Sequence, residues 1–243
     1  MRQIARLSLL AIAMALYAAL AQGTASASTW SWSTVERPAA AVAGERIVSV
    51  RVRVEAGLTV TPDAIATVVG DILGDERGWV ALENVVFQIV ADVENPDLLV
   101  TVASPATTDQ LCLPLNTVGK LSCRRGGQVI LNVDRWSRGP DVYHDSYLGE
   151  IDEYRRYLVN HEVGHFLGKG HVTPANCSLE VRAPVMMQQT FGLNGCAING
   201  WPSLDNGPAE VAEAKEPGSL TRALVERRPL ISPWKFTRNP LRA

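Results

Sequence analysis

Several features are scarce in this 243-residue chain, and each scarcity excludes a class of protein. The formal net charge is only −2, so the strong basic excess typical of nucleic-acid-binding proteins is missing. The apolar run near the N-terminus, residues 7–20, is shorter than the roughly 20 residues that span a bilayer. The four cysteines show no CxxC spacing, which argues against cysteine-bound metal. Without internal repeats, the chain is expected to form one domain with a substantial core.

The N-terminus has the three parts of a secretory signal peptide. Arg2 and Arg6 precede the apolar run, and small residues follow it, with Ala25 and Ala27 at the −3 and −1 positions. We expect cleavage after residues 1–27, with an uncleaved anchor as the alternative, and therefore a protein that is secreted or held in the cell envelope. Cleavage removes two arginines and no acid, which moves the formal net charge from −2 to −4.

The cysteines form an even set, as expected of an exported protein. Cys112 and Cys123 are 11 residues apart, and Cys177 and Cys196 are 19 apart. Four cysteines allow three connectivities, and the sequence does not choose among them. Pairing each cysteine with its neighbour in the chain is the simplest arrangement, and each such loop stabilises the fold by roughly 3 kcal/mol in the chain-entropy model.

Hydrophobic periodicity predicts an α/β arrangement. Residues 47–54, IVSVRVRV, alternate strictly and are typical of a half-buried strand. Thr61 as N-cap and Pro62 at the first helical position begin a helix that ends near Gly74 or Gly78. Further strands are predicted at 85–91, 98–103 and 128–133.

A second helix is predicted over residues 150–168, where an apolar stripe continues into two histidines. The stripe has a 3,4,3,4 spacing and consists of Ile151, Tyr154, Leu158, His161 and His165. The predicted organisation is then a signal peptide at 1–27, an irregular lead-in at 28–45, one domain at 46–205 and a flexible tail at 206–243. The tail is acidic and then basic, so a weak contact with an anionic cell-wall or membrane surface is an alternative to a purely solvated tail.

The eleven residues from 161 to 171, HEVGHFLGKGH, hold three of the four histidines and carry the functional prediction. On a helix, His161 and His165 lie one turn apart on one face. Gly168 permits a positive φ, so the chain can turn back and bring His171 to the same point. Three imidazoles with an open fourth position are the ligand set of a catalytic zinc ion. The glycine and the third histidine make this pattern far rarer by chance than a bare HExxH.

Glu162, between the first two ligands, is expected to act as general base. A zinc ion lowers the pKa of bound water and polarises a carbonyl, and Glu162 takes the proton of the attacking water. Other divalent metals bind such sites too. Asn160 and Asp152 are candidates for orienting the ligand imidazoles. His144, the remaining histidine, is interpreted as a solvated loop residue.

The same run resembles the zinc signature of the metzincin clan of metallopeptidases, HExxHxxGxxH, with every specified position present. Downstream, APVMMQQ resembles the Met-turn of that clan, with Met186 at the methionine position and Met187 as the alternative. Gln188 stands where some metzincins have a tyrosine, so that role is not carried over. Over residues 151–196 the chain is similar to a secreted, mainly actinobacterial metzincin-like family of uncharacterised function.

The resemblance implies a twisted, mostly parallel sheet with an antiparallel edge strand, two main helices with zinc on the second, and a small lower subdomain containing the Met-turn. Substrate is expected to lie extended along the edge, with residues 111–121 as part of the rim. We therefore expect a secreted, monomeric, Zn²⁺-dependent endopeptidase acting on a protein or peptide substrate, without a nucleic-acid partner. The alternative is a zinc-bearing, non-proteolytic binding domain of the cell envelope, or a hydrolase of another amide.

Overall fold

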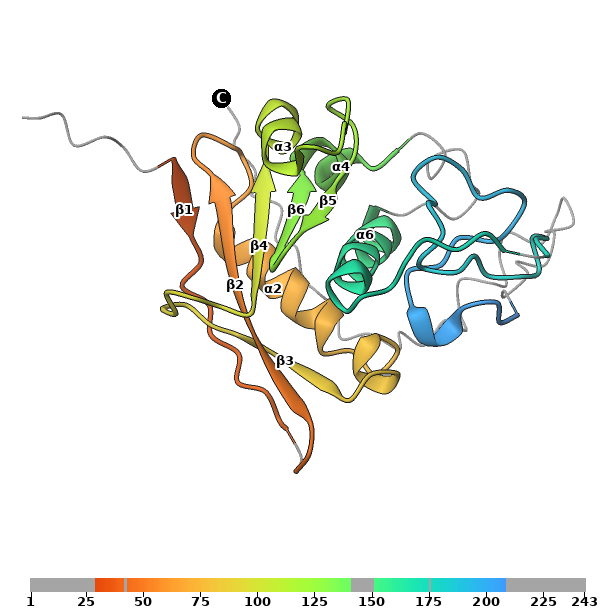
Figure 1. The fold of residues 1–243 in the computed structure, drawn as a ribbon, viewed down its shortest axis with the longest axis horizontal. Helices are drawn as coiled ribbons and strands as arrows, with labels where there is room; N and C mark the ends of the chain where they lie inside the picture. The colour runs from red at the N-terminus through yellow and green to blue at the C-terminus, as the bar shows by residue number, and fades with distance from the viewer. Residues whose placement is uncertain (1–28, 42, 141–150, 175, 209–243) are drawn as a thin grey trace, which may run out of the picture.

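A computed structural model of the chain describes residues 29–41, 43–140, 151–174 and 176–208 (Figure 1). The predicted signal peptide, the loop with His144 and nearly all of the predicted tail lie outside the described residues. Within the described part, no helix is long and apolar enough to cross a membrane. The strands are β1 (Trp30–Trp32), β2 (Arg46–Glu55), β3 (Val85–Ile89), β4 (Leu98–Ala103), β5 (Cys123–Arg125) and β6 (Gln128–Asn132). The α-helices are α2 (Pro62–Leu73), α3 (Pro105–Cys112), α4 (Val133–Arg138) and α6 (Ile151–Phe166).

The strands form one mixed sheet in the order β1-β2-β4-β6-β5, and β3 also pairs with β2. The pairs β2–β3, β2–β4 and β4–β6 are parallel. The outer pairs β1–β2 and β5–β6 are antiparallel. The prediction of an α/β fold with a mostly parallel sheet and an antiparallel edge is confirmed, and the edge strand near α6 is β5.

Strand β2 follows the alternation predicted from its sequence. Its valines, Val48, Val50, Val52 and Val54, are at most 1% exposed and face the main core. Helices α2 and α6 contribute to the same core and lie on one side of the sheet, as Figure 1 shows for α2 behind β2 and β4. The side chains between the valines therefore project from the opposite face of the sheet.

Helix α2 begins and ends as predicted. The Thr61 hydroxyl accepts a hydrogen bond from the backbone N–H of Ala64 (3.3 Å), Pro62 occupies the first turn, and Gly74 is the C-cap. Its buried face packs against β2 and β3. The strands predicted at 85–91, 98–103 and 128–133 are β3, β4 and β6, each within two residues of the prediction.

The lead-in predicted to be irregular contains the short strand β1. Its Trp30 and Trp32 rings lie under the guanidinium groups of Arg53 and Arg51, at 4.0 and 4.1 Å. These cation–π contacts hold β1 across the open face of β2. Since they join residues about 20 positions apart, no local periodicity predicted the strand.

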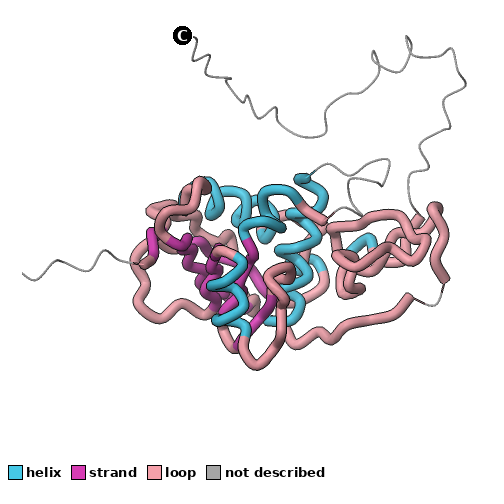
Figure 2. Tube along the Cα trace, turned by 90° about the horizontal axis from the view of Figure 1, so that it is seen from above, coloured by secondary structure: helices cyan, strands magenta, loops and turns pink. Residues whose placement is uncertain are grey.

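The chain after the third histidine has almost no regular structure. We call residues 172–174 and 176–208 the loop region; its one helical element is a short 3₁₀ turn, Pro202–Leu204. Figure 2 shows it as a block of loops beside the sheet and helices. The Cys177–Cys196 disulfide lies within it, while Cys112–Cys123 joins α3 to β5. Of the three possible connectivities, the simplest, which pairs each cysteine with its neighbour in the chain, is therefore confirmed.

Candidate metal centre

The three histidines of the motif converge on one point. His161 and His165 stand on consecutive turns of α6, and the helix ends at Phe166. Gly168 then has a φ of 87°, which a side chain would disfavour, and the chain turns back to His171. One ligand atom from each histidine lies within 4.8 Å of the others, and the two Nε2 atoms of His165 and His171 are 3.1 Å apart. This cluster has the composition and spacing needed to hold a metal ion.

Two backbone carbonyls orient the helical histidines. His161 Nδ1 lies 2.7 Å from the carbonyl oxygen of Val185, and His165 Nδ1 lies 2.8 Å from that of Lys169. A carbonyl only accepts, so each Nδ1 carries the proton and donates. The Nε2 lone pair of each ring is then free to bind a cation.

The prediction that Asn160 or Asp152 orients a ligand is wrong. The Asn160 side-chain amide donates to the Gly200 carbonyl, and Asp152 pairs with Arg155 on the outer surface of α6. The orienting groups are main-chain carbonyls instead, which any residue can supply. This is why side-chain chemistry in the sequence did not identify them.

Burial favours the neutral form of two of the three imidazoles, those of His161 and His171. Desolvation lowers the pKa of His161 to about 3, and it also lowers the pKa of His171. The neighbouring histidines lower both values further. At neutral pH both rings are therefore unprotonated, which is the form that binds metal.

Glu162 lies beside the cluster and is only 5% exposed. Its Oε2 atom is buried and has no hydrogen-bond partner within the described part of the chain. Burial raises the pKa of this carboxyl to about 8. A buried carboxyl with an unpaired oxygen is costly unless a ligand, water or cation meets it, so its position favours a chemical role over a structural one.

Met186 lies directly against α6 beneath the histidines. It is 5% exposed and follows Val185 in a turn closed by a hydrogen bond from the Met187 N–H to the Pro184 carbonyl (3.0 Å). Gly164 makes this approach possible, because a Cβ there would lie 2.3 Å from Met186 Sδ. The carbonyl that orients His161 and the methionine below it thus come from adjacent residues of one turn.

Three polar side chains of the loop region hold that turn in place. Asn199 and Gln189, both fully buried, hydrogen-bond to the backbone where the turn begins: Asn199 donates to the Ala183 carbonyl, and Gln189 donates to the Pro184 carbonyl. The Asp205 carboxylate accepts from the N–H of Val185 (2.8 Å) and from the Asn199 amide (3.0 Å). We call Asn199, Gln189 and Asp205 the polar hub. Sequence reasoning missed it because its members are up to 16 residues apart and carry no motif.

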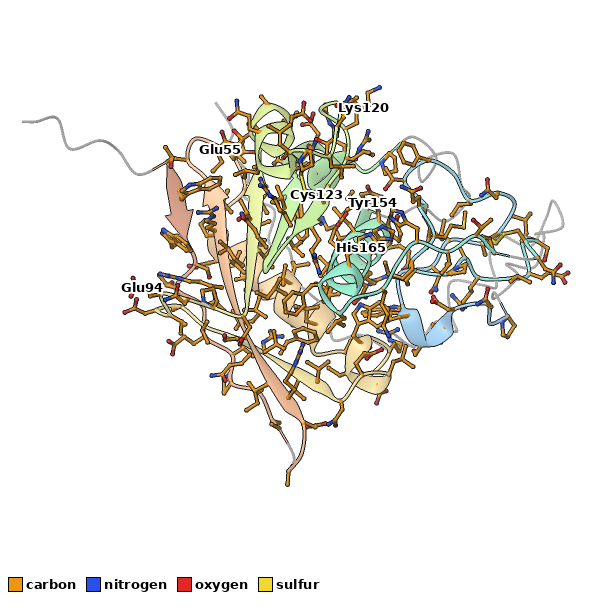
Figure 3. The ribbon with its side chains drawn as sticks, in the orientation of Figure 1. Glu55, Glu94, Lys120, Cys123, Tyr154 and His165 are labelled. Atoms are coloured by element: carbon orange, nitrogen blue, oxygen red, sulfur yellow. A yellow bond between two sulfur atoms is a disulfide. The ribbon has the colours of Figure 1, made fainter. Side chains whose placement is uncertain are left out.

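The histidines open into a cleft of about 480 Å³ between β5 and the loop region. Cys123 of β5 and His165 of α6, both labelled in Figure 3, line it. Leu115 and Leu121 from the rim predicted at 111–121 also line it, and Phe191 contributes from the loop region. The cleft therefore brings an edge strand, three imidazoles and a buried carboxyl together around a shared space.

The comparisons with known proteins place the chain in a family without assigning it an activity. No curated protein and no solved structure gives a significant match to this chain. A family model, described as a protein of unknown function (DUF3152), matches residues 19–212 and so covers α6, all three histidines and the polar hub. The chain belongs to the DUF3152 family.

Proposed function

We propose that this protein is an exported zinc-dependent endopeptidase that hydrolyses peptide bonds in a protein or peptide substrate. The observation that carries the proposal is the buried carboxyl oxygen of Glu162, unpartnered in the described chain, next to three converging imidazoles. A purely structural metal site does not require a neighbouring carboxyl group, and burying one without a hydrogen-bond partner destabilises the folded protein. The two disulfides are consistent with export.

The donor set fits zinc better than the hard cations. Magnesium and calcium prefer oxygen ligands, whereas His161, His165 and His171 supply only nitrogen. Three protein ligands also leave one position for water or substrate, as in hydrolytic zinc sites. We further propose that the Pro184–Met187 turn with Met186 corresponds to the Met-turn of the metzincin clan, and that α6 corresponds to its zinc helix.

Zinc in this site lowers the pKa of a bound water and polarises the substrate carbonyl. Glu162 accepts the proton of the attacking water and then donates it to the leaving amine. Its raised pKa, about 8 without metal, suits a group that gains and loses a proton near neutral pH. Val185 and Lys169 keep His161 and His165 in the tautomer that this arrangement requires.

The test compares the wild-type protein with a Glu162→Gln variant. Zinc per chain is quantified by elemental analysis, and cleavage of a mixed peptide library is followed by mass spectrometry. We expect one zinc per chain in both proteins, and peptide cleavage that falls at least about 100-fold in the variant. Asp152→Asn, which removes a carboxylate from the outer surface of the same helix, is the matched control and retains wild-type cleavage.

Three outcomes would overturn the proposal. Cleavage that persists in Glu162→Gln would remove the general base from the reaction. Zinc-loaded wild-type protein that cleaves no library member would favour the alternative, a zinc-bearing envelope domain without proteolysis. A protein that purifies without zinc and does not bind it on addition would remove the cofactor itself.

A further inference from the structure

The cleft contains one cation, the Arg124 guanidinium, that no residue in the described part of the chain neutralises. Two basic residues line it, Lys169 and Arg124. Lys169 forms an ion pair with Glu83, with Nζ and Oε1 2.5 Å apart. Arg124 has no ion pair and no side-chain hydrogen bond within the described residues. Because an arginine stays charged at any physiological pH, this positive charge is permanent.

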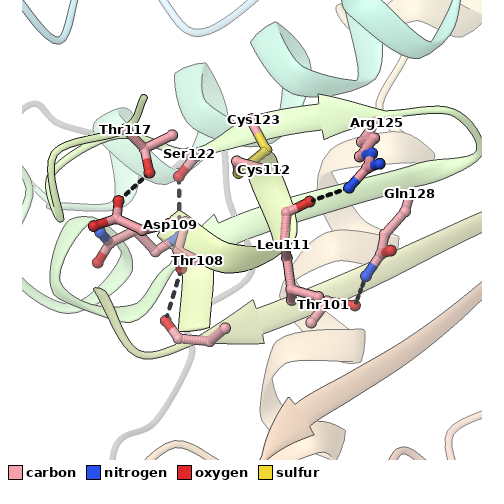
Figure 4. The surroundings of a disulfide bond; sticks show 12 residues. Thr101, Thr108, Asp109, Leu111, Cys112, Thr117, Ser122, Cys123, Arg125 and Gln128 are labelled. Carbon is pink, nitrogen blue, oxygen red and sulfur yellow. Dashed lines mark hydrogen bonds between the residues drawn. A yellow bond between two sulfur atoms is a disulfide. The ribbon is translucent and has the colours of Figure 1, made fainter. Parts of the chain in front are cut away.

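The alternation of β5 directs Arg124 into the cleft. Cys123 and Arg125 point to the face of the sheet that α3 covers: Cys123 is bonded to Cys112, and the Arg125 guanidinium donates to the Leu111 carbonyl (Figure 4). Successive side chains of a strand point to opposite faces, so Arg124 projects from the other face, toward α6. Strand β5 packs against α6, which carries the histidines.

Among the described residues, Arg124 has no counter-ion in the cleft. The one acidic residue of ranges 29–41, 43–140, 151–174 and 176–208 that lines the cleft is Glu162, which is buried and adjacent to the histidine cluster. The three histidines contribute no negative charge, so a bound divalent cation makes the cleft more positive still. An anionic group entering the cleft meets attraction from both the metal and the guanidinium.

We propose that Arg124 forms a recognition subsite for a carboxylate group of the substrate. The inference rests on the proposed peptidase function and adds a substrate class to it: peptides that carry a carboxylate close to the scissile bond. A planar guanidinium binds a carboxylate through two parallel N–H···O bonds, which fixes orientation as well as charge.

The remainder of the cleft favours a polypeptide over a small free anion. Leu115 and Phe191 line it and are 52% and 67% exposed, which leaves apolar side chains on both sides without a partner in the described chain. A peptide can cover these side chains while its carboxylate meets Arg124. The carboxylate can come from an acidic side chain or from a free C-terminus, and the experiment separates the two sources.

The experiment uses pooled peptides synthesised in matched versions. Each sequence occurs with Glu or with Gln at every position in turn, and each version occurs with a C-terminal acid or a C-terminal amide. We expect wild-type kcat/KM to be about tenfold higher for the carboxylate member of a pair, since a charged hydrogen bond in a partly open cleft has about this effect. Preference for Glu over Gln identifies a side-chain subsite, and preference for the acid over the amide identifies a C-terminal one.

Arg124→Gln abolishes this preference, and Arg124→Glu reverses it in favour of Lys-containing peptides. Arg125→Gln is the matched control, because it removes the neighbouring arginine from the opposite face of the same strand and leaves the preference unchanged. The preference also weakens as salt rises from 0.05 to roughly 0.5 M, because ionic strength screens an exposed charge pair.

A binding readout keeps this inference separate from the proposed function. The same labelled peptides are titrated into zinc-loaded Glu162→Gln protein and followed by fluorescence anisotropy. Arg124-dependent binding of carboxylate peptides without any cleavage by the wild type supports the subsite while contradicting the peptidase. Cleavage without carboxylate preference, or preference that survives Arg124→Gln, overturns the subsite while leaving the peptidase intact. If no peptide is bound or cleaved, both are wrong.

Discussion

The histidine cluster lies where two regions meet that are stabilised in different ways. The sheet and its helices bury mainly apolar side chains, and parallel strand ladders satisfy their backbone groups. The loop region has a much smaller apolar cluster around Ala183, Met187 and Cys196, and buried side-chain amides add hydrogen bonds to its turns. His161 and His165 depend on the first region, whereas the carbonyl that orients His161 depends on the second.

This difference shows which contacts fix the positions of the histidines and of the Val185 carbonyl. A helix places ligands one turn apart through local hydrogen bonds alone. The loop region must fix Val185 and Met186 against that helix through specific long-range contacts, each of which a single substitution can remove. Two glycines allow close contact between the two regions. Gly164 of α6 faces Met186, and Gly200 of the loop region approaches α6 so closely that a Cβ would lie 2.6 Å from Arg156 Cβ.

The largest effect on zinc binding is expected from adding a side chain at this contact with Gly164→Ala. The added Cβ would lie 2.3 Å from Met186 Sδ and 2.8 Å from Trp79 Cζ2, so the methionine or the indole must move. Overpacking of this kind costs about 1–3 kcal/mol, partly offset by the better helix propensity of alanine. We expect a lower unfolding free energy in urea and at least a tenfold weaker zinc affinity, since Val185 moves with Met186.

Gly170→Ala controls for this prediction. It also adds one methyl group near the histidines, but its Cβ would meet nothing within 4 Å. Urea denaturation and zinc titration are measured on both variants. If Gly164→Ala and Gly170→Ala behave alike, the tight contact between the two regions does not position the ligands.

An intermediate effect on zinc binding is expected from one of the two disulfides, which lie in different regions. Replacing either pair by serine costs roughly 3 kcal/mol of unfolding free energy in the chain-entropy model. Only removal of Cys177–Cys196 should also weaken zinc binding, because Cys196 packs with Met187 next to the turn that holds Val185. The Cys112–Cys123 pair joins α3 to β5 and makes no contact with that turn. Equal losses of zinc affinity in the two double variants would contradict the division into two regions.

The same division explains what the sequence could predict. The alternating valines of β2, the Thr61–Pro62 start of α2 and the stripe along α6 are local patterns, and the structure has all three elements. The short elements α3, α4 and β5 were not predicted, although Ser104 and Pro105 form an N-cap signal for α3 that local reading could have used. The histidines were predicted to converge, and they do.

The loop region could not be predicted, because its order depends on contacts between residues distant in the chain. Nothing local distinguishes Asn199 or Gln189 from exposed amides, yet both are fully buried. The groups that orient His161 and His165 are main-chain carbonyls, which leave no trace in residue identity. The predictions therefore succeeded for long elements with a local pattern, missed short ones such as α3, and failed for the amides that fix the turn through long-range hydrogen bonds.

The smallest and most specific effect is expected at Asp205, because its carboxylate acts on His161 only through the backbone of Val185. It accepts from the Val185 N–H, and the carbonyl of the same residue accepts from His161 Nδ1. The carboxylate fixes the backbone of Val185 and so the carbonyl that orients His161, and its negative charge attracts a cation bound nearby. We expect Asp205→Asn to weaken zinc binding about tenfold, measured by competition with a chelator.

Stability without zinc should change in the opposite direction. Burial raises the pKa of Asp205 to about 7, above its ordinary value of 3.8. A carboxyl whose pKa is higher in the folded than in the unfolded state binds more protons when folded, so its contribution to stability falls as pH rises from about 4 to about 7. Asp205→Asn removes that loss, and at pH 8 the zinc-free variant should unfold at higher urea than the zinc-free wild type. A variant that is both less stable and weaker in zinc binding would show that Asp205 only fills space, whereas greater stability with weaker binding is the signature of a charge retained for the metal.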